Sequence, residues 1–513
     1  MNGSDPDSNP AIDIETMKKI MSHCLLILGF LIPVIAVSQV NNDQLKQIRS
    51  EVRQKIDGKE YYIHIVKKGQ TLYMISKAYG VDVNEVIKEN PEVKQGIKVD
   101  LKLRIPVPGQ KSSEPAQNLQ LSKVQEPSLP LPDSRMVRED TLPQKADTST
   151  GIPCSTGKEI KGRAYKVALM LPLVLSEVDR IDPQEPEISE TLNSLKFIEF
   201  YEGFRMALDS LEKSGLELKL FVFDIGKDTV RTRQVLKKTE MKKMDLIIGL
   251  LYHRNFQMVA EFAKKNKIPI VNPISERSDL IKGNPYVFKV CPSRKTQPAN
   301  LSPVLEQNFS RSQILIVRNN QYKDRDAPDQ LKKECAKLTL STQVVDGTDN
   351  AISSLSKSKE NVLVFFTENN NYILDLSRKL SERRNDYTIS IVGLPAWDKI
   401  EELEADYMVN LNAHLIASNF IDYENPLIKK FTGKFQETIK TDPGPLAFLG
   451  YDIGYYFLSA LMKYGGHFIN CIGDYTMKGL QSTFEFRQEK GSGFENQHWE
   501  IYKFDNYRLV KIN

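Results

Sequence analysis

The sequence is poor in the residues that build metal and catalytic centres. Its 513 residues include only 5 Cys, 6 His and 2 Trp, and the cysteines form no CxxC pair. The HExxH, HxH and GxSxG patterns of zinc and serine hydrolases are missing, and so is the GxxxxGKS/T pattern of a phosphate-binding loop. Four of the six histidines stand alone in the main part of the chain, which is typical of surface or core residues: His253, His414, His467 and His498. We therefore expect no metal, no cofactor and no enzyme activity.

The charged residues are almost balanced and form no basic block. Lys and Arg number 70 against 66 Asp and Glu, which gives a net charge of +4. No basic segment is interleaved with aromatic residues, so the sequence has no nucleic-acid footprint. The apolar content of 40% is that of a globular protein, and the length predicts two or three domains.

Only one long apolar run is present, from Cys24 to Val37, and it follows Lys18-Lys19. A run of this length is too short to cross a hydrocarbon core of about 30 Å comfortably. Small residues at Ala36 and Ser38 are those that a signal peptidase reads. We predict that residues 1–38 are an N-terminal extension and signal peptide, cleaved near Ser38-Gln39, and that the mature protein is periplasmic. An uncleaved membrane anchor is the alternative.

The chain before this run is acidic, with Asp5, Asp7, Asp13 and Glu15, which is the wrong sign for a signal peptide. Translation is therefore expected to start at Met17. Four cysteines remain after cleavage, and four cysteines allow two disulfides in three pairings.

Four segments follow the cleavage site. Residues 39–59 carry Leu45, Ile48, Val52 and Ile56 at helical spacing and predict an amphipathic lead-in helix. Residues 60–107 form a compact periodic module. Residues 108–163 are rich in Pro, Ser, Gln and Lys, which predicts a linker. Residues 164–513 alternate apolar strands with helical patterns and form the main folded body.

The small module reads as strand, helix, helix, strand. Tyr62 to Val66 alternates as a strand, a helix begins after Thr71 and ends at Gly80, and a second helix runs from Val83 to Asn90. A last strand covers Val99 to Ile105. The order βααβ and the residue pattern resemble a LysM module. The pattern is Val66-x-x-Gly69-x-Thr71-Leu72-x-x-Ile75-Ser76-x-x-Tyr79-Gly80, then Asn90, then Leu103-x-Ile105-Pro106.

The LysM resemblance implies binding of N-acetylglucosamine-containing chains, and hence peptidoglycan, in a groove between two loops. Backbone donors and a small apolar patch in tight loops suit an acetamido group. Gln70 stands where an acidic residue is usual, and Asp100 stands where glycine is usual. Carried over by position, the glycan-binding residues are Gly69, Gln70, Thr71, Leu72, Asn90, Pro91 and Ile97.

The body repeats a β-α-β pattern twice. Continuous apolar runs of strand length are typical of parallel strands that are covered on both faces. In the first half they are 166–173, 219–223, 244–249 and 268–272, with helices over 197–211 and 256–265; in the second half they are 313–317, 343–345, 361–366 and 388–392, with helices over 330–338 and 372–380. The fold class is therefore α/β, with two doubly wound lobes. Residues 483–512 alternate around Gly491-Ser492-Gly493 and predict a terminal β-hairpin region.

The body also resembles the type I periplasmic-binding-protein fold of amino-acid receptors. The resemblance is carried by Ala168-Leu-Met-Leu-Pro-Leu173, Phe200-Tyr201-Glu202-Gly203-Phe204, Asp245-Leu-Ile-Ile-Gly249, Ile268-Pro-Ile-Val-Asn-Pro273 and Leu449-Gly-Tyr-Asp452. It implies a ligand cleft at the strand ends of two lobes, with candidate residues Tyr252, Ser275, Trp397 and Asp398. The third strand ends Gly249-Leu250-Leu251-Tyr252, where amino-acid binders usually have proline and a hydroxyl residue.

These resemblances predict a non-catalytic wall-binding protein that serves as a scaffold, sensor or regulator of the envelope. Its body would bind a small amino-acid-like or wall-derived ligand, or an envelope protein partner. This layout is similar to that of outer-membrane activators of peptidoglycan synthases. One alternative is the solute-binding component of an amino-acid ABC importer. Another is a wall hydrolase with an unrecognised carboxylate site, because two acidic residues leave no spacing signature.

Overall fold

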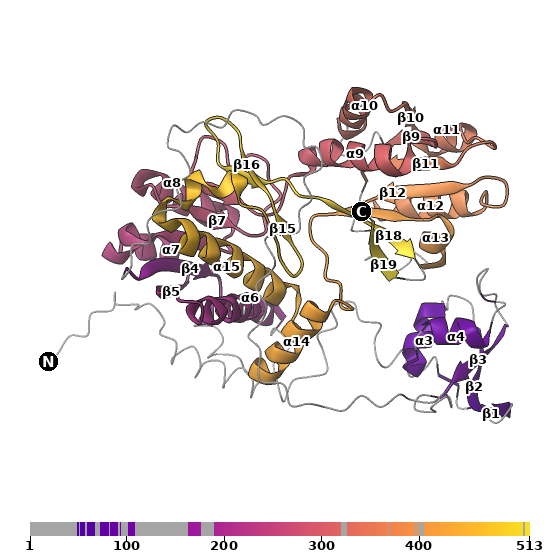
Figure 1. Ribbon diagram of the computed structural model, residues 1–513, viewed down its shortest axis with the longest axis horizontal. Coiled ribbons are helices and arrows are strands. Elements are labelled where there is room, and N and C mark those ends of the chain that lie inside the picture. Colours follow the sequence, from indigo (N-terminus) through magenta and orange to yellow (C-terminus); the bar gives the residue numbers. More distant parts are fainter. Residues whose placement is uncertain are drawn as a thin grey trace. The chain divides into compact units, whose positions relative to one another are not determined.

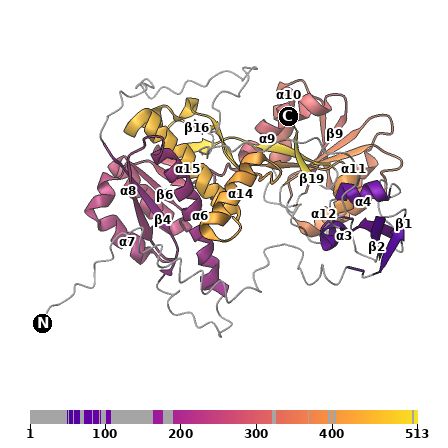
Figure 2. The ribbon, with the colours of Figure 1, turned by 60° about the horizontal axis from the view of Figure 1, so that its bottom comes forward.

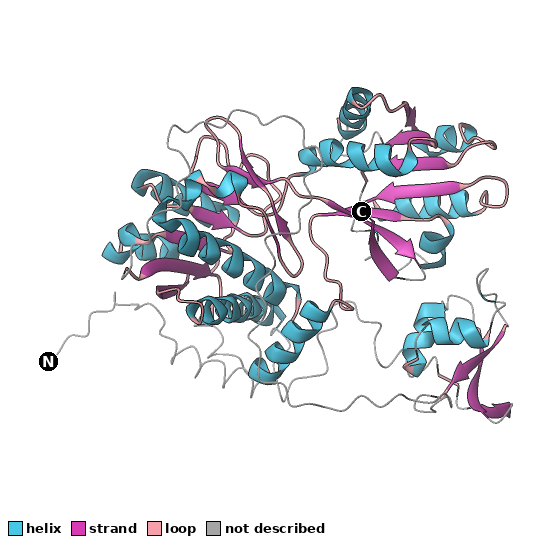
Figure 3. Ribbon diagram, viewed as in Figure 1, coloured by secondary structure: helices cyan, strands magenta, loops and turns pink. Residues whose placement is uncertain are grey.

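The computed structural model describes three folded parts of the chain, shown in Figures 1 and 3. The described residues are 49–50, 52–56, 59–66, 72–81, 83–90, 93, 101–107, 163–175, 189–319, 326–367, 369–394, 397, 400, 405–505 and 508–512. The predicted signal peptide and nearly all of the predicted linker lie outside them. Within these ranges no helix has both the length and the apolar character needed to span a membrane.

The small module folds as the sequence predicts and has one additional strand. A three-stranded antiparallel sheet in the order β1-β2-β3 packs on two helices. Its elements are β1 (Arg53–Ile56), β2 (Lys59–Ile65), α3 (Leu72–Tyr79), α4 (Val83–Glu89) and β3 (Lys102–Pro106). The core includes Ile75, Val86, Leu103 and Ile105, all fully buried. Gly80 ends α3 with φ of +68°, the left-handed conformation that favours glycine after a helix.

The predicted lead-in helix is wrong over Arg53–Ile56, which form a strand. Ile56 pairs with Lys59, so only Asp57-Gly58 separates the two strands, and Asp-Gly is a strong two-residue hairpin signal. Arg53 Nη2 donates to Tyr62 Oη at 2.8 Å, and its guanidinium lies 4.7 Å from the Tyr62 ring centroid. Sheet pairing satisfies the backbone of this segment, whereas a short isolated helix is only marginally stable in water.

Lobe one comprises residues 163–296 and 418–498 among those described. Its seven-stranded sheet has the order β16-β17-β8-β7-β6-β4-β5 and is parallel from β17 to β5. The elements are β4 (Tyr165–Leu171), α6 (Ser189–Glu212), β5 (Leu218–Asp224), α7 (Thr229–Lys237), β6 (Leu246–Gly249), α8 (His253–Asn266), β7 (Ile270–Asn272), β8 (Val287–Lys289), α14 (Pro426–Ile439), α15 (Pro445–Tyr464), β14 (Met477–Lys478), β15 (Thr483–Phe484), β16 (Phe486–Gln488) and β17 (Phe494–Asn496).

Helices cover both faces of the lobe-one sheet, as Figure 2 shows. Alternate residues of β4 point to opposite faces: Leu169 belongs to the core under α6 and α15, whereas Met170 belongs to the core under α7 and α8. Burial on both faces explains why the strand is a continuous apolar run. The predicted doubly wound fold is confirmed for this lobe.

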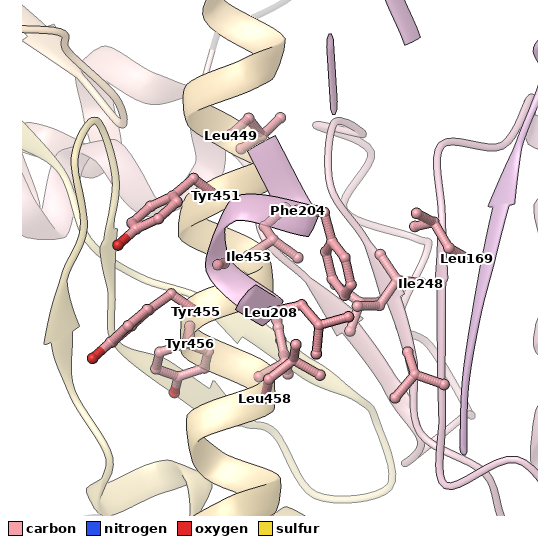
Figure 4. Close-up of a cluster of buried hydrophobic side chains, with 14 of the residues drawn as sticks. Leu169, Phe204, Leu208, Ile248, Leu449, Tyr451, Ile453, Tyr455, Tyr456 and Leu458 are labelled. Carbon is pink, nitrogen blue, oxygen red and sulfur yellow. The ribbon is translucent and has the colours of Figure 1, made fainter. Parts of the chain in front are cut away.

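Helices α6 and α15 approach each other unusually closely (Figure 4). A Cβ atom on Gly203 would lie 1.9 Å from the carbonyl oxygen of Ala447, and one on Gly450 would lie 2.1 Å from that of Phe200. Both positions therefore require glycine, because neither carbonyl can move without breaking its helix. The sequence motifs Tyr-Glu-Gly-Phe and Leu-Gly-Tyr-Asp, which carry the family resemblance, contain the two glycines of this helix contact.

Lobe two comprises residues 297–417 and 499–513. Its seven-stranded sheet has the order β10-β9-β11-β12-β13-β18-β19, parallel up to β13 and antiparallel beyond it. The elements are α9 (Gln297–Phe309), β9 (Gln313–Arg318), α10 (Ala327–Lys337), β10 (Thr342–Asp346), α11 (Gly347–Ser353), β11 (Asn361–Phe365), α12 (Asn370–Ser381), β12 (Ile389–Gly393), α13 (Ala405–Asn410), β13 (His414–Ala417), β18 (Glu500–Asp505) and β19 (Arg508–Ile512). The second doubly wound lobe is confirmed.

The predicted terminal hairpin region divides between the two lobes. Strands β16 and β17 pair on either side of Gly491, whose φ is +77°, and join the sheet of lobe one. Strands β18 and β19 form a second hairpin in the sheet of lobe two. The end of the chain therefore contributes an edge to each lobe.

The described cysteines do not form the two disulfides that four cysteines would allow. Cys291 and Cys335 carry free thiols, and Cys471 is disulfide-bonded. In the parts of the chain that the structure describes, no group of three or more His, Cys, Asp and Glu side chains is placed to hold a metal ion.

His414 makes the stability of lobe two depend on pH. Its ring is 4% exposed, packs edge-on against Phe309, and has no hydrogen-bond partner at Nδ1. Burial lowers the pKa of His414 to about 4, whereas the unfolded chain protonates near pH 6.5. The folded state therefore binds this proton less readily than the unfolded chain. As the pH falls from 6.5 to 4, the free energy of unfolding of lobe two decreases by about 3 kcal/mol.

This prediction has a convenient probe, because both tryptophans, Trp397 and Trp499, belong to lobe two. Denaturant unfolding followed by tryptophan fluorescence should show a loss of about 2 kcal/mol between pH 7 and pH 5 in the wild type. The variant His414→Leu should lack most of that loss. An equal pH dependence in both proteins would contradict the assignment to His414.

Candidate functional site

The topology of lobe two places a crevice at the carboxyl ends of β9 and β11. Strand β9 is the first strand of the lobe, and its two neighbours, β10 and β11, are the next two along the chain. The chain therefore leaves β9 towards one side and returns past it to the other. In doubly wound sheets such a switch point is where ligands bind, because the connecting loops part there.

A pocket lies at this switch point. It is a small, partly open hollow, and the roughly 280 Å³ of space between its lining atoms includes open solvent. Its lining comes from the end of β9 (Val317, Arg318, Asn319), from the end of β11 (Phe365, Phe366, Thr367) and from the first turns of α10 and α12 (Pro328, Tyr372). The side chain of Asn369 caps α12 by accepting from Tyr372 N at 3.1 Å, which fixes Tyr372 at the pocket.

The charge of this pocket is already compensated. Arg318 donates from Nη1 to Asp346 Oδ1 at 2.9 Å and from Nη2 to Asp329 Oδ1 at 2.5 Å. These hydrogen bonds, that to Asp346 first, raise the pKa of Arg318 above its ordinary value. Burial likewise raises the pKa of Tyr372, so its hydroxyl stays protonated. The lining thus offers aromatic rings and neutral polar groups, which suit an uncharged or apolar part of a ligand.

The pocket residues Asn319, Thr367 and Tyr372 were not predicted from the sequence. Thr367 is the first polar residue after the apolar run 361–366, and Asn319 is the second after the run 313–317, behind Arg318. Because parallel strands end at the same edge of a sheet, polar residues directly after two strand runs were the available signal. What the sequence did not provide was the strand order, which makes β9 and β11 neighbours.

Of the two predicted residues of lobe two, the structure describes Trp397. Trp397 is 1% exposed, its Nε1 donates to Thr367 O at 3.2 Å, and its ring lies 5.9 Å from that of Phe365. Its indole therefore supports two residues of the pocket from inside the core. Asp398 lies outside the described residues.

The predicted residues of lobe one lie at the carboxyl ends of β6 and β7. Tyr252 precedes α8 and is 45% exposed, and Ser275 is held by a hydrogen bond from its N–H to Asn272 Oδ1 at 2.8 Å. Between β6 and Tyr252, the side chains of Leu250 and Leu251 are buried. This edge therefore combines an apolar base with an exposed aromatic ring, and it has no serine or threonine between β6 and Tyr252.

In the small module the structure gives a clear role to Asn90. Its side chain is fully buried, with Nδ2 donating to Val86 O at 2.7 Å and to Arg104 O at 2.8 Å, while Oδ1 accepts from Arg104 N at 2.8 Å. The amide thereby ties the end of α4 to β3. Leu72 is the first residue of α3. The other predicted glycan residues, Gly69, Gln70, Thr71, Pro91 and Ile97, lie outside the described residues.

We expect Asn90→Ala to destabilise the module by about 2–3 kcal/mol, because the carbonyl and N–H groups of Arg104 lose their side-chain partners and Val86 O loses one of its two hydrogen bonds. Thermal unfolding of a fragment spanning residues 49–107 measures the effect by circular dichroism. Glu85→Ala, at an exposed position on the same helix, is the matched control and should be neutral within about 0.5 kcal/mol. Equal melting temperatures for both variants would refute this role of Asn90.

Two known families match separate parts of the chain. The LysM domain matches residues 64–106. The periplasmic binding protein family matches residues 197–470, more than half of the chain. The chain therefore belongs to the periplasmic binding protein family and carries a LysM domain.

One solved structure with a TM-score above 0.5 agrees with this assignment at the level of the fold, and two further structures are similar with lower TM-scores. A branched-chain amino acid ABC transporter protein from Rhodospirillum rubrum has a TM-score of 0.52 and 14% identity, over 68% of this chain and 100% of that chain. The leucine-binding protein LivK from Thermotoga maritima has a TM-score of 0.39 and 16% identity, over 68% and 98%. Full-length LpoA from Haemophilus influenzae has a TM-score of 0.44 and 10% identity, over 68% and 59%. No curated protein matches the chain.

Proposed function

We propose that this protein is a non-catalytic component of the bacterial cell envelope that holds peptidoglycan through its LysM domain and binds a second ligand through its bilobed body. The observation that carries the proposal is that one chain joins a LysM domain to a periplasmic-binding-protein body. LysM modules grip N-acetylglucosamine-containing chains, and periplasmic binding proteins act outside the inner membrane. Both parts meet their ligands in the periplasm.

Peptidoglycan contact falls on two loops of the LysM domain, Gly69 to Leu72 and Asn90 to Ile97. The buried amide of Asn90 supports this assignment indirectly, because it fixes the point at which the chain leaves α4. Loop amides and carbonyl groups at residues 69–72 and 91–97 then provide the polar contacts to the acetamido groups. Asn90 is in this view a positioning residue, since its own polar atoms are used inside the module.

The body binds a ligand that offers an uncharged or apolar group to lobe two. Phe365, Phe366 and Tyr372 supply the aromatic surface, and Arg318 is already paired with two carboxylates. A free amino acid, which carries a charge at each backbone end, needs unpaired partners for both charges. A wall-derived fragment or a segment of an envelope protein can instead insert one neutral group and keep its charges in water.

The strand ends of lobe one also favour a ligand with an uncharged or apolar group. Val230, Tyr252 and Ile274 follow β5, β6 and β7 and are each about half exposed. Exposed apolar groups at strand ends suit a ligand or partner with apolar surface. We therefore favour a scaffold, sensor or regulatory role over the solute-binding component of an amino-acid importer.

A melting-temperature screen of the full-length protein tests this choice. Soluble fragments from enzymatically digested sacculi should raise the melting temperature, and single free amino acids should leave it unchanged; a ligand at 100 times its Kd adds about 2.7 kcal/mol. Tyr372→Ala should abolish the shift, while Asn371→Ala, at an exposed position of the same helix, should preserve it. A shift of several degrees with leucine or another free amino acid would favour the importer alternative.

The absence of catalysis is tested separately by zymography. The full-length protein should leave no clearing band in a gel that contains embedded cell wall. A clearing band would support the alternative of a wall hydrolase with a carboxylate site.

A further inference from the structure

The chain passes between the two lobes three times, after Thr296, after Ala417 and after His498. We call these passages the first, second and third crossings. On the lobe-one side, each crossing is attached to a carboxylate that is almost completely buried. The two carboxylates are Glu495 and Asp452, with 2% and 1% of the residue exposed.

Glu495 lies close in sequence to the third crossing and forms hydrogen bonds to residues that precede the first crossing. It pairs in register with Lys289 across β17 and β8, and Lys289 Nζ lies 3.0 Å from Glu495 Oε1 with both side chains buried. The same oxygen accepts from Ser293 N at 2.7 Å and from the Ser293 hydroxyl. Ser293 lies three residues before the first crossing, and Glu495 itself lies three residues before the third.

The chain between Glu495 and the third crossing is also held. Asn496 Nδ2 donates to Thr483 O at 2.8 Å, and Asn496 Oδ1 accepts from Glu485 N at 2.9 Å. Gln497 N donates to Glu485 O at 2.9 Å. The backbone is therefore fixed to lobe one up to the last residue before His498.

Asp452 serves the second crossing through a short loop. From helix α15 its carboxylate accepts from the backbone N–H groups of Leu480 at 2.6 Å and of Gln481 and Ser482, each at 2.9 Å. Gln481 O accepts from Phe420 N at 2.8 Å, and Asn419 forms a β-bridge with Ser482. The loop thus connects Asp452 to the first residues after the second crossing.

We propose that Glu495 and Asp452 form an anchor that fixes where all three crossings leave lobe one, so that any turning of lobe two is confined to the few residues beyond each anchored point. A buried carboxyl group that accepts several hydrogen bonds holds its partners firmly, because bending would leave its oxygen atoms, and at Glu495 also the charge paired with Lys289, without partners in a low-dielectric site. Hinges act at a few residues next to rigid elements. This inference concerns motion and is independent of which ligand the body binds.

Distances measured by pulsed electron paramagnetic resonance test the anchor in the full-length protein. Spin labels introduced through non-canonical amino acids at Glu261 on α8 and Lys333 on α10 report on one lobe each, because both positions are exposed. Glu495→Gln keeps the size of the side chain and removes its charge. We expect its interlobe distance distribution to be wider than that of the wild type, because Lys289 loses its counter-charge and a neutral amide oxygen accepts more weakly from Ser293 than a carboxylate does.

Asp245→Asn is the matched control. Asp245 is also a half-enclosed carboxylate of lobe one that accepts from a backbone N–H, Lys166 N at 2.9 Å, but it precedes β6 and touches no crossing. It should lower the melting temperature without widening the distribution. Ser293→Ala removes only the donor at the first crossing, and it provides the test if Glu495→Gln fails to fold. A folded Glu495→Gln or Ser293→Ala protein with the wild-type width, or an equal widening in Asp245→Asn, would overturn the proposal.

Discussion

Gly450→Ala is expected to lower the free energy of unfolding of lobe one by about 3 kcal/mol. The added methyl group would lie 2.1 Å from the carbonyl oxygen of Phe200, and Gly203 faces Ala447 in the same way at 1.9 Å. Neither neighbour is a flexible side chain, so α6 and α15 must separate. Separation would open the core between them, which includes Phe204, Ile453 and Leu458 (Figure 4).

Urea unfolding followed by far-ultraviolet circular dichroism measures this effect. Gly433→Ala is a sharp control, because Gly433 lies inside α14 and an added Cβ would meet no atom within 4 Å. That control should stabilise the protein by about 0.5–1 kcal/mol, since alanine is the better helix former. A Gly450→Ala protein that unfolds at the wild-type urea concentration would show that the helices are not in close contact.

Trp397→Ala is expected to destabilise lobe two by about 3–5 kcal/mol, the usual effect of removing a large buried aromatic side chain. Its ring contacts Phe365, covers Gly393, and donates to Thr367 O. Trp397→Phe should cost less, because it keeps much of the packing and loses the hydrogen bond. The remaining Trp499 reports the unfolding of lobe two by fluorescence.

This substitution also separates two roles for Trp397. A tryptophan that only lines a ligand cleft, as the sequence predicts, would be replaced with little change in stability and a large loss of ligand binding. A core tryptophan behind the pocket would lose stability first. Wild-type stability of Trp397→Ala would contradict the core role.

The sequence was most informative where structure is local. The helices of the LysM module end at Gly80 and Asn90 as predicted, because a glycine cap and a spacing pattern act over a few residues. The strands of both lobes are apolar runs because helices cover both faces of each sheet. The sequence motifs around Gly203 and Gly450 indicated the family fold, because the close contact of α6 and α15 tolerates only glycine at these positions.

Long-range pairing was what the sequence did not reveal. The neighbourhood of β9 and β11 depends on strand order, so the pocket residues Asn319 and Thr367 were missed. The bond between Lys289 and Glu495 joins positions 206 residues apart. Strand β1 is a different case, because the local hairpin signal Asp57-Gly58 is present in the sequence but four apolar residues at helical spacing favour a helix over the same segment.

Co-sedimentation with purified sacculi tests the central claim most directly, because it asks whether the full-length protein holds peptidoglycan through its LysM domain. The wild-type protein should pellet with sacculi, and a variant that lacks residues 49–107 should stay in the supernatant. Asn90→Ala should pellet less than Glu85→Ala, because a destabilised module presents its loops less often. A wild-type protein that stays in the supernatant, or a deletion variant that pellets equally well, would contradict the account.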